Sequence, residues 1–198
     1  MTVSSRQMKT EIIEKLGNKC LVFVGMMGSG KSAIGRMVAT TLDLEFYDSD
    51  LEIEKAADMS VADIFEKLGE AEFRRGEHKV IERVLGNGPL VLALGGGAFL
   101  SGATRDIVGK RATSIWLTAD VDLLHSRVMR KPGKRPLLEN GDAMQILTNL
   151  SNARNPIYQL ADLKIESLDA SRMKTRDAVI AHLHDFFCDS LAINGIHK

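Results

Sequence analysis

Residues 25–32 have the composition and spacing of a phosphate-binding loop. They read Gly-Met-Met-Gly-Ser-Gly-Lys-Ser and match the pattern G-x-x-x-x-G-K-[ST] between an apolar run and an amphipathic segment. In such a loop, backbone amides surround the phosphates, the lysine reaches the terminal phosphates and the hydroxyl ligates magnesium. The alternative is a glycine-rich turn without a ligand. We expect ATP and Mg²⁺ to bind here, with Lys31 also catalytic, through Gly28, Ser29, Gly30, Lys31, Ser32 and Ala33.

Two aspartates, Asp48 and Asp50, follow the second predicted strand with one serine between them. Residues two apart in an extended chain project to the same side, so we expect both carboxylates to face the phosphate loop. Asp48 is then placed to hold magnesium with Ser32, and Asp50 to accept a hydrogen bond from a substrate hydroxyl and take its proton. The alternative is that Asp50 is only the N-cap of a helix that begins at Leu51.

Two arginines in separate predicted helices are candidate ligands for an anionic substrate. Arg74 and Glu77 are three residues apart and share a helix face, so the acid is placed to orient the guanidinium. Arg154 lies late in another helix, just before a proline. Guanidiniums that converge from two elements would clamp a carboxylate through charge-assisted hydrogen bonds. Surface ion pairing is the alternative for either arginine.

Three consecutive glycines, Gly95, Gly96 and Gly97, follow the third predicted strand. Because they lack side chains, their backbone is able to approach a substrate closely and offer amides to it. A flexible turn is the alternative. Their position after a strand places them at the same end of the sheet as the phosphate loop, and we therefore expect all three to bind substrate.

A basic stretch after residue 129 contains two prolines and a glycine, which exclude a continuous helix. We expect a mobile lid over residues 130–142. Arg135 on such a lid would fold over the transferring phosphoryl group and exclude water, so it is a candidate catalytic and ATP-binding residue. A solvated run of charge is the alternative.

The elements that must position these residues alternate between short apolar runs and amphipathic segments. The runs predict strands at residues 21–24, 44–47, 90–94, 114–117 and 163–165. The segments predict helices at residues 31–42, 61–85, 121–129, 143–161 and 174–187. This alternation predicts an α/β three-layer sandwich of the P-loop kinase type, in which helices cover both faces of a five-stranded parallel sheet.

The chain has 198 residues, and we expect one kinase domain over residues 1–198. Its core would span residues 19–187, with a helical substrate-binding insert at 51–88. Residues 1–18 form an N-terminal extension, in which residues 8–16 are either an amphipathic helix or a flexible tail.

Charge and cysteine usage exclude several functional classes. Lys plus Arg and Asp plus Glu both total 26, so bulk charge attracts neither nucleic acid nor an anionic membrane. No apolar run approaches the roughly 18 residues of a membrane span. Cys20 and Cys188 lie far apart, and we expect them to form neither a disulfide nor a metal site. These features favour a cytoplasmic protein.

Taken in order, the motifs resemble those of the shikimate kinase family. They are the phosphate loop followed by I-G-R, then D-S-D, F-R-x-x-E, G-G-G, R-P-L-L and R-x-P-x-Y, and the similarity covers about residues 19–187. The resemblance implies a monomer that transfers the γ-phosphate of ATP to the 3-hydroxyl of shikimate, in aromatic amino acid biosynthesis.

The same resemblance implies individual roles. It gives Asp50 the ring hydroxyls, Arg74 and Arg154 the shikimate carboxylate, Gly96 a backbone contact and Arg135 the ATP phosphates. The second lid arginine of the family corresponds to either Arg127 or Arg130. Adenine-binding residues of the family lie near residues 168–176, where this sequence matches poorly, so none is assigned.

Two alternative functions remain open at this point. The phosphate loop alone does not identify the acceptor, so a P-loop kinase for gluconate or a nucleotide is one alternative. The other is a nucleotide-binding module that transfers nothing, although such modules usually lack an acid or lysine that is present here.

Overall fold

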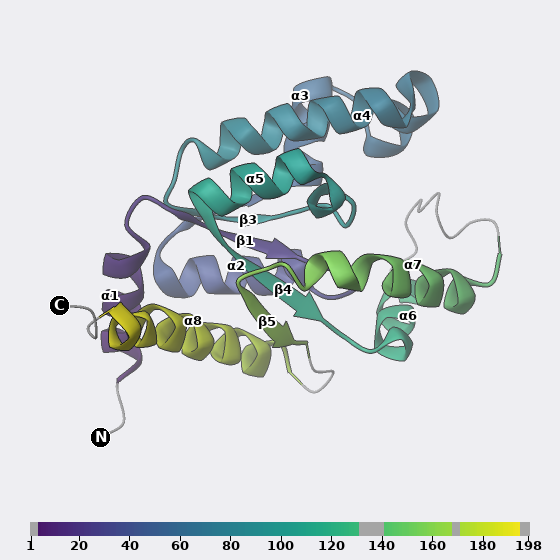
Figure 1. The fold of residues 1–198 in the computed structure, drawn as a ribbon. Helices are drawn as coiled ribbons and strands as arrows, with labels where there is room; N and C mark the ends of the chain where they lie inside the picture. Colours follow the sequence, from purple (N-terminus) through teal and green to yellow (C-terminus); the bar gives the residue numbers. More distant parts are fainter. Residues whose placement is uncertain (1–3, 131–140, 168–170, 195–198) are drawn as a thin grey trace.

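The computed structural model describes residues 4–130, 141–167 and 171–194. Within these ranges the chain forms a parallel sheet whose strands lie in the order β2-β3-β1-β4-β5 (Figure 1). The strands are β1 (Cys20–Val24), β2 (Glu45–Asp48), β3 (Leu90–Ala93), β4 (Ala112–Thr118) and β5 (Leu163–Glu166). All five strands predicted from the sequence are present, and the parallel α/β sheet is confirmed.

The two faces of the sheet are covered by different helices. One face carries α1 (Ser5–Leu16), α2 (Lys31–Leu42) and α8 (Arg172–Asn194). The apolar cluster on the other face contains buried side chains from α3 (Ser49–Ala57), α4 (Val61–Leu85), α5 (Gly102–Arg111), α6 (Val121–Met129) and α7 (Ala143–Tyr158). A 3₁₀ helix, η1 (Ala98–Leu100), follows the triple glycine. The result is the expected three-layer arrangement (Figure 1).

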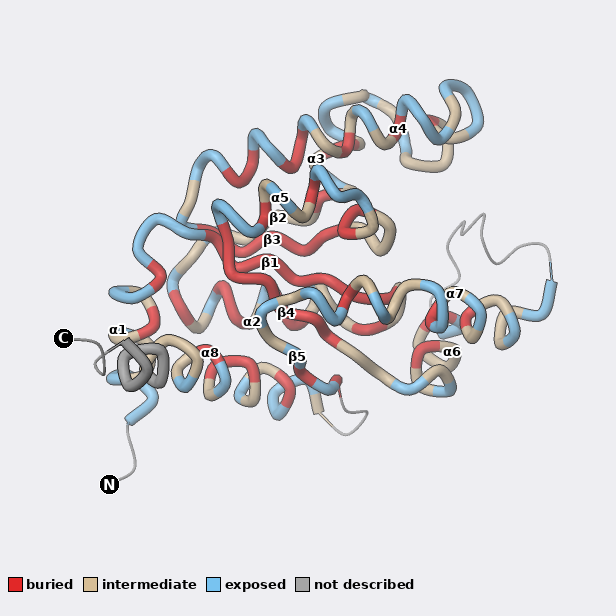
Figure 2. The backbone as a smooth tube through the Cα atoms, viewed as in Figure 1, coloured by how far each residue is buried: buried red, intermediate tan, exposed pale blue. Residues whose placement is uncertain are grey.

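The central strand, β1, shows why both layers are needed. All five of its residues are buried (Figure 2). Val22 and Val24 pack into the cluster on the α4 and α5 face, whereas Leu21 and Phe23 pack into the cluster on the α2 and α8 face. Successive side chains of a strand point to opposite faces, so an apolar run without alternation requires cover on both sides.

Several helices differ in detail from the sequence expectation. The N-terminal extension forms a helix rather than a tail: α1 begins after the N-cap Ser4 and buries Ile12 against the cluster that contains α8. Helix α4 has the predicted bounds but is kinked at Gly69, where φ is 82° and ψ is 167°. Helix α7 ends three residues earlier than predicted, at Tyr158, and α8 begins earlier, at Arg172.

Helix α5 was not singled out from the sequence, and its composition explains why. It contains two glycines and buries only Thr104 and Val108, so it has no continuous apolar stripe. Across the described ranges, no helix combines the length and apolar character needed to cross a lipid bilayer.

Candidate active site

The phosphate loop connects β1 to α2, as its pattern requires. Gly28 and Gly30 have φ angles of 81° and 98°, a backbone region that side-chain-bearing residues rarely adopt. Lys31 folds back over the loop, and its Nζ donates hydrogen bonds of 3.0 Å to the carbonyl oxygens of Gly25 and Met26. The hydroxyl of Ser29 is buried and has no hydrogen-bond partner among the residues described. The loop therefore holds a lysine and an unsatisfied hydroxyl beside bare backbone, which suits an anion.

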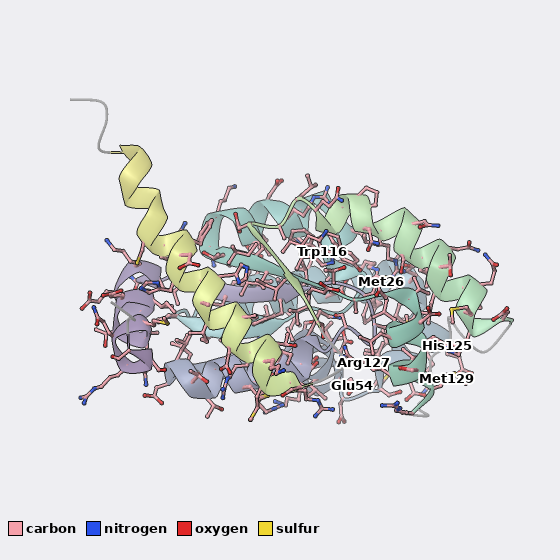
Figure 3. The ribbon with its side chains drawn as sticks, turned by 90° about the horizontal axis from the view of Figure 1, so that it is seen from below. Met26, Glu54, Trp116, His125, Arg127 and Met129 are labelled. Carbon is pink, nitrogen blue, oxygen red and sulfur yellow. The ribbon has the colours of Figure 1, made fainter. Side chains whose placement is uncertain are left out.

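A pocket of about 530 Å³ opens from this loop. It is lined by residues from the loop and α2, from the ends of β2 and β3, and from α6 and α8. These include Gly28, Gly30, Lys31, Ser32, Ala33, Asp48, Asp50, Gly95, Gly96, Arg127, Arg130, Ser167, Arg172 and Thr175. Figure 3 shows Arg127 on α6 at the end of the molecule away from α1. The carboxyl ends of parallel strands are the usual position of ligand sites in such sheets.

Ser32 and Asp48 meet at the edge of this pocket. The Ser32 hydroxyl donates a hydrogen bond of 2.6 Å to Oδ2 of Asp48. Asp48 is the last residue of β2 and the N-cap of α3, and its Oδ1 accepts a bond of 3.1 Å from the amide of Asp50. Two oxygen donors from separate elements thus lie side by side, a donor set that magnesium prefers.

The expected extended geometry of the aspartate pair is wrong. Asp50 lies in the first turn of α3, which begins at Ser49, and the N-cap is Asp48 rather than Asp50. The Asp50 amide donates the capping bond to Oδ1 of Asp48, and the helix starts at Ser49, two residues earlier than the sequence suggested. Both carboxylates still line the pocket because the first turn of α3 remains next to the end of β2.

Asp50 has an unusual electrostatic environment. Removal from water raises the pKa of this carboxyl, and the nearby negative charge of Asp48 raises it further, against the opposing charges of Lys31 and Arg74. A carboxylate whose proton affinity is increased in this way is better suited to accept a proton from a hydroxyl group.

The three glycines lie against charged side chains of the site. A Cβ on Gly95 would collide with Oδ1 of Asp50, and a Cβ on Gly97 would stand 2.5 Å from Nη2 of Arg74. On Gly96, a Cβ would lie 3.7 Å from Nη1 of Arg154. Asp50, Arg74 and Arg154, far apart in the sequence, are therefore gathered around one glycine run.

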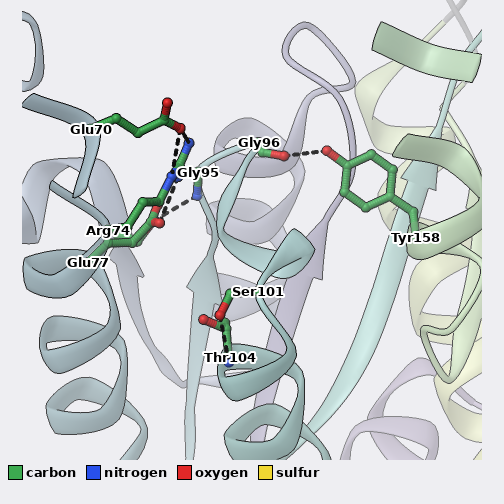
Figure 4. Close-up of polar contacts among 9 residues, drawn as sticks. Glu70, Arg74, Glu77, Gly95, Gly96, Ser101, Thr104 and Tyr158 are labelled. Atoms are coloured by element: carbon green, nitrogen blue, oxygen red, sulfur yellow. Dashed lines mark hydrogen bonds and ion pairs between the residues drawn. The ribbon is translucent and has the colours of Figure 1, made fainter. Parts of the chain in front are cut away.

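Two further hydrogen bonds fix this run. The buried Ser49 accepts a bond of 2.8 Å from the Gly95 amide, which ties the end of β3 to α3. The hydroxyl of Tyr158, a fully buried residue of α7, donates to the carbonyl of Gly96 (Figure 4). The arrangement of Arg154 near Gly96 thus depends on an anchored α7.

Arg74 is held by two acids of its own helix, as Figure 4 shows. Its Nη1 bonds Oε2 of Glu77 at 2.7 Å, and its Nη2 lies 3.3 Å from Oε1 of Glu70. The Glu77 pairing predicted from the sequence is thereby confirmed. Burial raises the pKa of Glu77 although the pairing with Arg74 lowers it. The neighbouring Arg75 is exposed and pairs with the exposed Glu72, whereas Arg74 also pairs with the buried Glu77.

Sequence reasoning missed part of the pocket wall. Ser167, Arg172 and Thr175 line it from the end of β5 and the start of α8. Arg127 contacts this wall through a bond of 2.9 Å to the Ser167 hydroxyl, and Arg127 and Arg130 both line the pocket. Arg127 and Arg130 therefore both remain candidates for the second lid arginine.

The lid itself falls largely outside the described residues. Arg135 lies in the segment 131–140, outside the described residues. Residues 168–170 also lie outside the described ranges; they belong to the segment 168–176, near which the family has its adenine-binding residues.

Comparisons with known proteins show the family to which the chain belongs. The family model for shikimate kinase matches residues 27–184. A shikimate kinase of Mesorhizobium japonicum is 43% identical over 93% of this chain and 89% of its own length, and one of Bradyrhizobium diazoefficiens is 46% identical over 93% and 88%.

Solved structures show the same relationship. The structure of shikimate kinase from Acinetobacter baumannii in complex with shikimate has a TM-score of 0.80 and 30% sequence identity, and the match covers 94% of this chain and 99% of that one. A gluconokinase from Sinorhizobium meliloti, 14% identical with a TM-score of 0.62 over 90% of this chain and 98% of that chain, shares the fold alone. The phosphate loop, the paired aspartates and the two arginines thus occur in a chain that belongs to the shikimate kinase family.

Proposed function

We propose that this chain transfers the γ-phosphate of ATP to the 3-hydroxyl of shikimate, giving shikimate 3-phosphate and ADP. The observation that carries the proposal is that Asp50, Arg74 and Arg154 surround the triple glycine, of which Gly95 and Gly96 line the phosphate-loop pocket. The acceptor then needs both a hydroxyl and a carboxylate, which a hydroxylated cyclic acid provides. Membership of the shikimate kinase family supports this choice.

On the nucleotide side, the amides of the phosphate loop and Lys31 hold the terminal phosphates. Lys31 exchanges its bonds to the carbonyls of Gly25 and Met26 for phosphate oxygens, so its charge is delivered to the transferring group. Ser32 and Asp48 are the residues that would hold Mg²⁺, since their oxygens are adjacent and face the pocket. When bound, Mg²⁺ neutralises charge on the phosphates.

On the acceptor side, Arg74 and Arg154 bind the carboxylate while Asp50 accepts the hydrogen of the attacking hydroxyl. The raised pKa of Asp50 favours transfer of that proton as the new bond to phosphorus forms. Gly95, Gly96 and Gly97 allow the ring to lie next to the backbone because no side chain blocks it. Positioning of the two reactants accounts for most of the catalysis in phosphoryl transfer.

Arg135 folds over the phosphates from the lid and excludes water from the reaction. Arg127 and Arg130, which already line the pocket, are the candidates for the second lid arginine. The enzyme acts as a cytoplasmic monomer with two small-molecule substrates.

A coupled assay of ADP formation tests the proposal against its rivals. Shikimate, gluconate and nucleoside monophosphates are compared as acceptors with MgATP in excess. We expect turnover with shikimate at a kcat/KM at least about a hundredfold above that with the other acceptors, because an acceptor without a matching carboxylate loses the charge-assisted contacts to Arg74 and Arg154. Turnover with gluconate or a nucleotide alone would assign a different acceptor, and no ADP with any acceptor would favour the non-catalytic module.

A further inference from the structure

A second cluster of polar side chains lies between α1 and α8, away from the nucleotide pocket. It consists of Glu11 on α1 and of His184 and Cys188 on α8. One ligand atom from each residue lies within 4.8 Å of the other two. From the sequence, no metal site is expected at Cys188. In the structure His184, one helical turn away on α8, lies on the same side of the helix, with its Nε2 3.6 Å from Sγ of Cys188.

We propose that Glu11, His184 and Cys188 bind one Zn²⁺ ion, with water completing a tetrahedral shell. The donor set is one carboxylate oxygen, one imidazole nitrogen and one sulfur, all of which are common zinc ligands. Three protein ligands and one exchangeable position form an established type of zinc coordination. No step of the kinase reaction is involved.

The distances fit zinc geometry. Bonds of about 2.3 Å to sulfur and about 2.0 Å to nitrogen place those two atoms about 3.6 Å apart around a tetrahedral ion. Sγ of Cys188 and Nε2 of His184 are 3.6 Å apart, and Sγ of Cys188 lies 3.9 Å from Oε2 of Glu11. Only the Glu11 to His184 pair, at 2.6 Å, is closer than zinc would hold it. Ligation requires that pair to open by less than about 1 Å.

The groups around the cluster suit ligation. Gln7 donates a hydrogen bond of 3.0 Å to Oε1 of Glu11, which orients the carboxylate and leaves Oε2 directed at His184. Asp185 lies 3.6 Å from Nδ1 of His184, close to the nitrogen that would not ligate the metal. Such outer contacts commonly orient metal ligands. The side chains of His184 and Glu11 are 13% and 34% exposed, so an ion is able to enter from solvent.

The position of the cluster gives the ion a structural consequence. Glu11 and His184 are 173 residues apart in the sequence, and they join the N-terminal extension to the last helix. Helix α1 precedes the first residue of β1, and the phosphate loop follows the last residue of that strand. The cluster therefore lies at the opposite end of the sheet from the pocket. An ion that binds only the folded chain therefore stabilises the docking of α1 on α8.

The test uses the full-length protein after removal of metals, with Mg²⁺ in excess to occupy the nucleotide pocket. Co²⁺ is added as a spectroscopic substitute for Zn²⁺. We expect one Co²⁺ per chain with the near-ultraviolet charge-transfer absorption of a cobalt–thiolate bond, lost on addition of Zn²⁺. Zn²⁺ should also raise the unfolding temperature of the wild type.

Matched variants assign the ligands. Cys188→Ser should abolish the charge-transfer band, and His184→Ala and Glu11→Gln should each weaken Zn²⁺ binding by more than about tenfold. His182→Ala is the control for His184, since His182 is exposed on the same helix and bonds the carbonyl of Ala178. Cys20→Ala is the control for the thiol, and both controls should retain the band.

A band that survives Cys188→Ser, or Zn²⁺ affinity unchanged in His184→Ala, would overturn the proposal. So would a wild type that binds no Co²⁺, in which case the cluster is only a hydrogen-bonded Glu11–His184 contact. Kinase activity and circular dichroism of each variant verify folding, because none of these residues lies in the nucleotide pocket.

Discussion

The guanidinium of Arg74 lies directly against the backbone of Gly97. A Cβ built on Gly97 would stand 2.5 Å from Nη2 and 2.8 Å from Nη1 of Arg74. The φ of Gly97 is −96°, which any residue is able to adopt, so the absence of a side chain matters here for space and not for backbone conformation.

Gly97→Ala should therefore displace the Arg74 guanidinium while the loop keeps its course. We expect the KM for shikimate to rise by on the order of tenfold, with little change in the KM for ATP, because only the carboxylate-binding side is disturbed. Initial-rate kinetics with each substrate varied in turn measure the split. Gly109→Ala on α5 is the control, since a Cβ there meets nothing within 4 Å. Equal KM changes for both substrates would contradict the assignment of Arg74.

Arg154→Ala tests the other half of the proposed clamp. Loss of one charge-assisted contact of about 1.5 to 3 kcal/mol predicts a KM for shikimate raised by roughly 10- to 100-fold, with the KM for ATP nearly unchanged. Arg75→Ala is a suitable control, because Arg75 is an exposed arginine that pairs with Glu72. An Arg154 variant with both KM values raised alike would argue against a carboxylate ligand.

Asp50→Asn separates catalysis from stability. Removal of a general base should lower kcat by about 10²- to 10⁴-fold. The fold should not be weakened, because burial and the Asp48 charge already raise the pKa of Asp50 and so disfavour its ionised form. Thermal unfolding and single-turnover kinetics measure the two effects. Near-normal turnover would remove Asp50 from the mechanism.

Lys31→Ala should abolish measurable turnover with shikimate. Its Nζ supplies the positive charge that the loop places next to the terminal phosphates. Loss of one such stabilising group lowers kcat by on the order of 10²- to 10³-fold or more. The Lys31 Nζ bonds the carbonyls of Gly25 and Met26 at the edge of the pocket and not within the apolar core, so the variant should still fold. Circular dichroism verifies folding, and substantial ADP formation by this variant would refute the assigned role.

The sequence predicted the sheet and the phosphate loop well because both depend on local patterns. The buried strands are apolar runs, and the loop is defined by residue types at fixed spacing. The aspartate pair shows the limit of such reasoning. The Asp48 carboxylate accepts a capping bond from the Asp50 amide, α3 begins at Ser49, and the side chain of Asp50 is placed by helical rather than extended geometry.

Contacts between distant elements were harder to predict. Ser167, Arg172 and Thr175 reach the pocket only because β5 and α8 pack beside the phosphate loop, and none carries a local signal. The pairing of Glu11 with His184 likewise depends on the docking of α1 on α8. Sequence spacing does not encode which helices share a face of the sheet, so both groups became visible only in three dimensions.

Glu77 gives a prediction about pH and stability. Burial raises the pKa of Glu77 above its ordinary value of 4.5, so the folded protein binds the proton more tightly than the unfolded chain does. Glu77 therefore contributes its full share to the free energy of unfolding at pH values below its pKa in the unfolded chain. This contribution is lost as pH rises through the higher pKa that Glu77 has in the folded protein. Glu77→Gln keeps an oxygen to accept the 2.7 Å bond from Arg74 but has no proton to lose.

The stability of the wild type relative to Glu77→Gln should consequently fall as pH rises from about 4 toward neutrality. Urea unfolding of both proteins across this range measures the difference, and subtracting the two curves removes the titration of all other groups. A wild type that gains stability relative to Glu77→Gln with rising pH would mean that the Arg74 charge outweighs burial at Glu77.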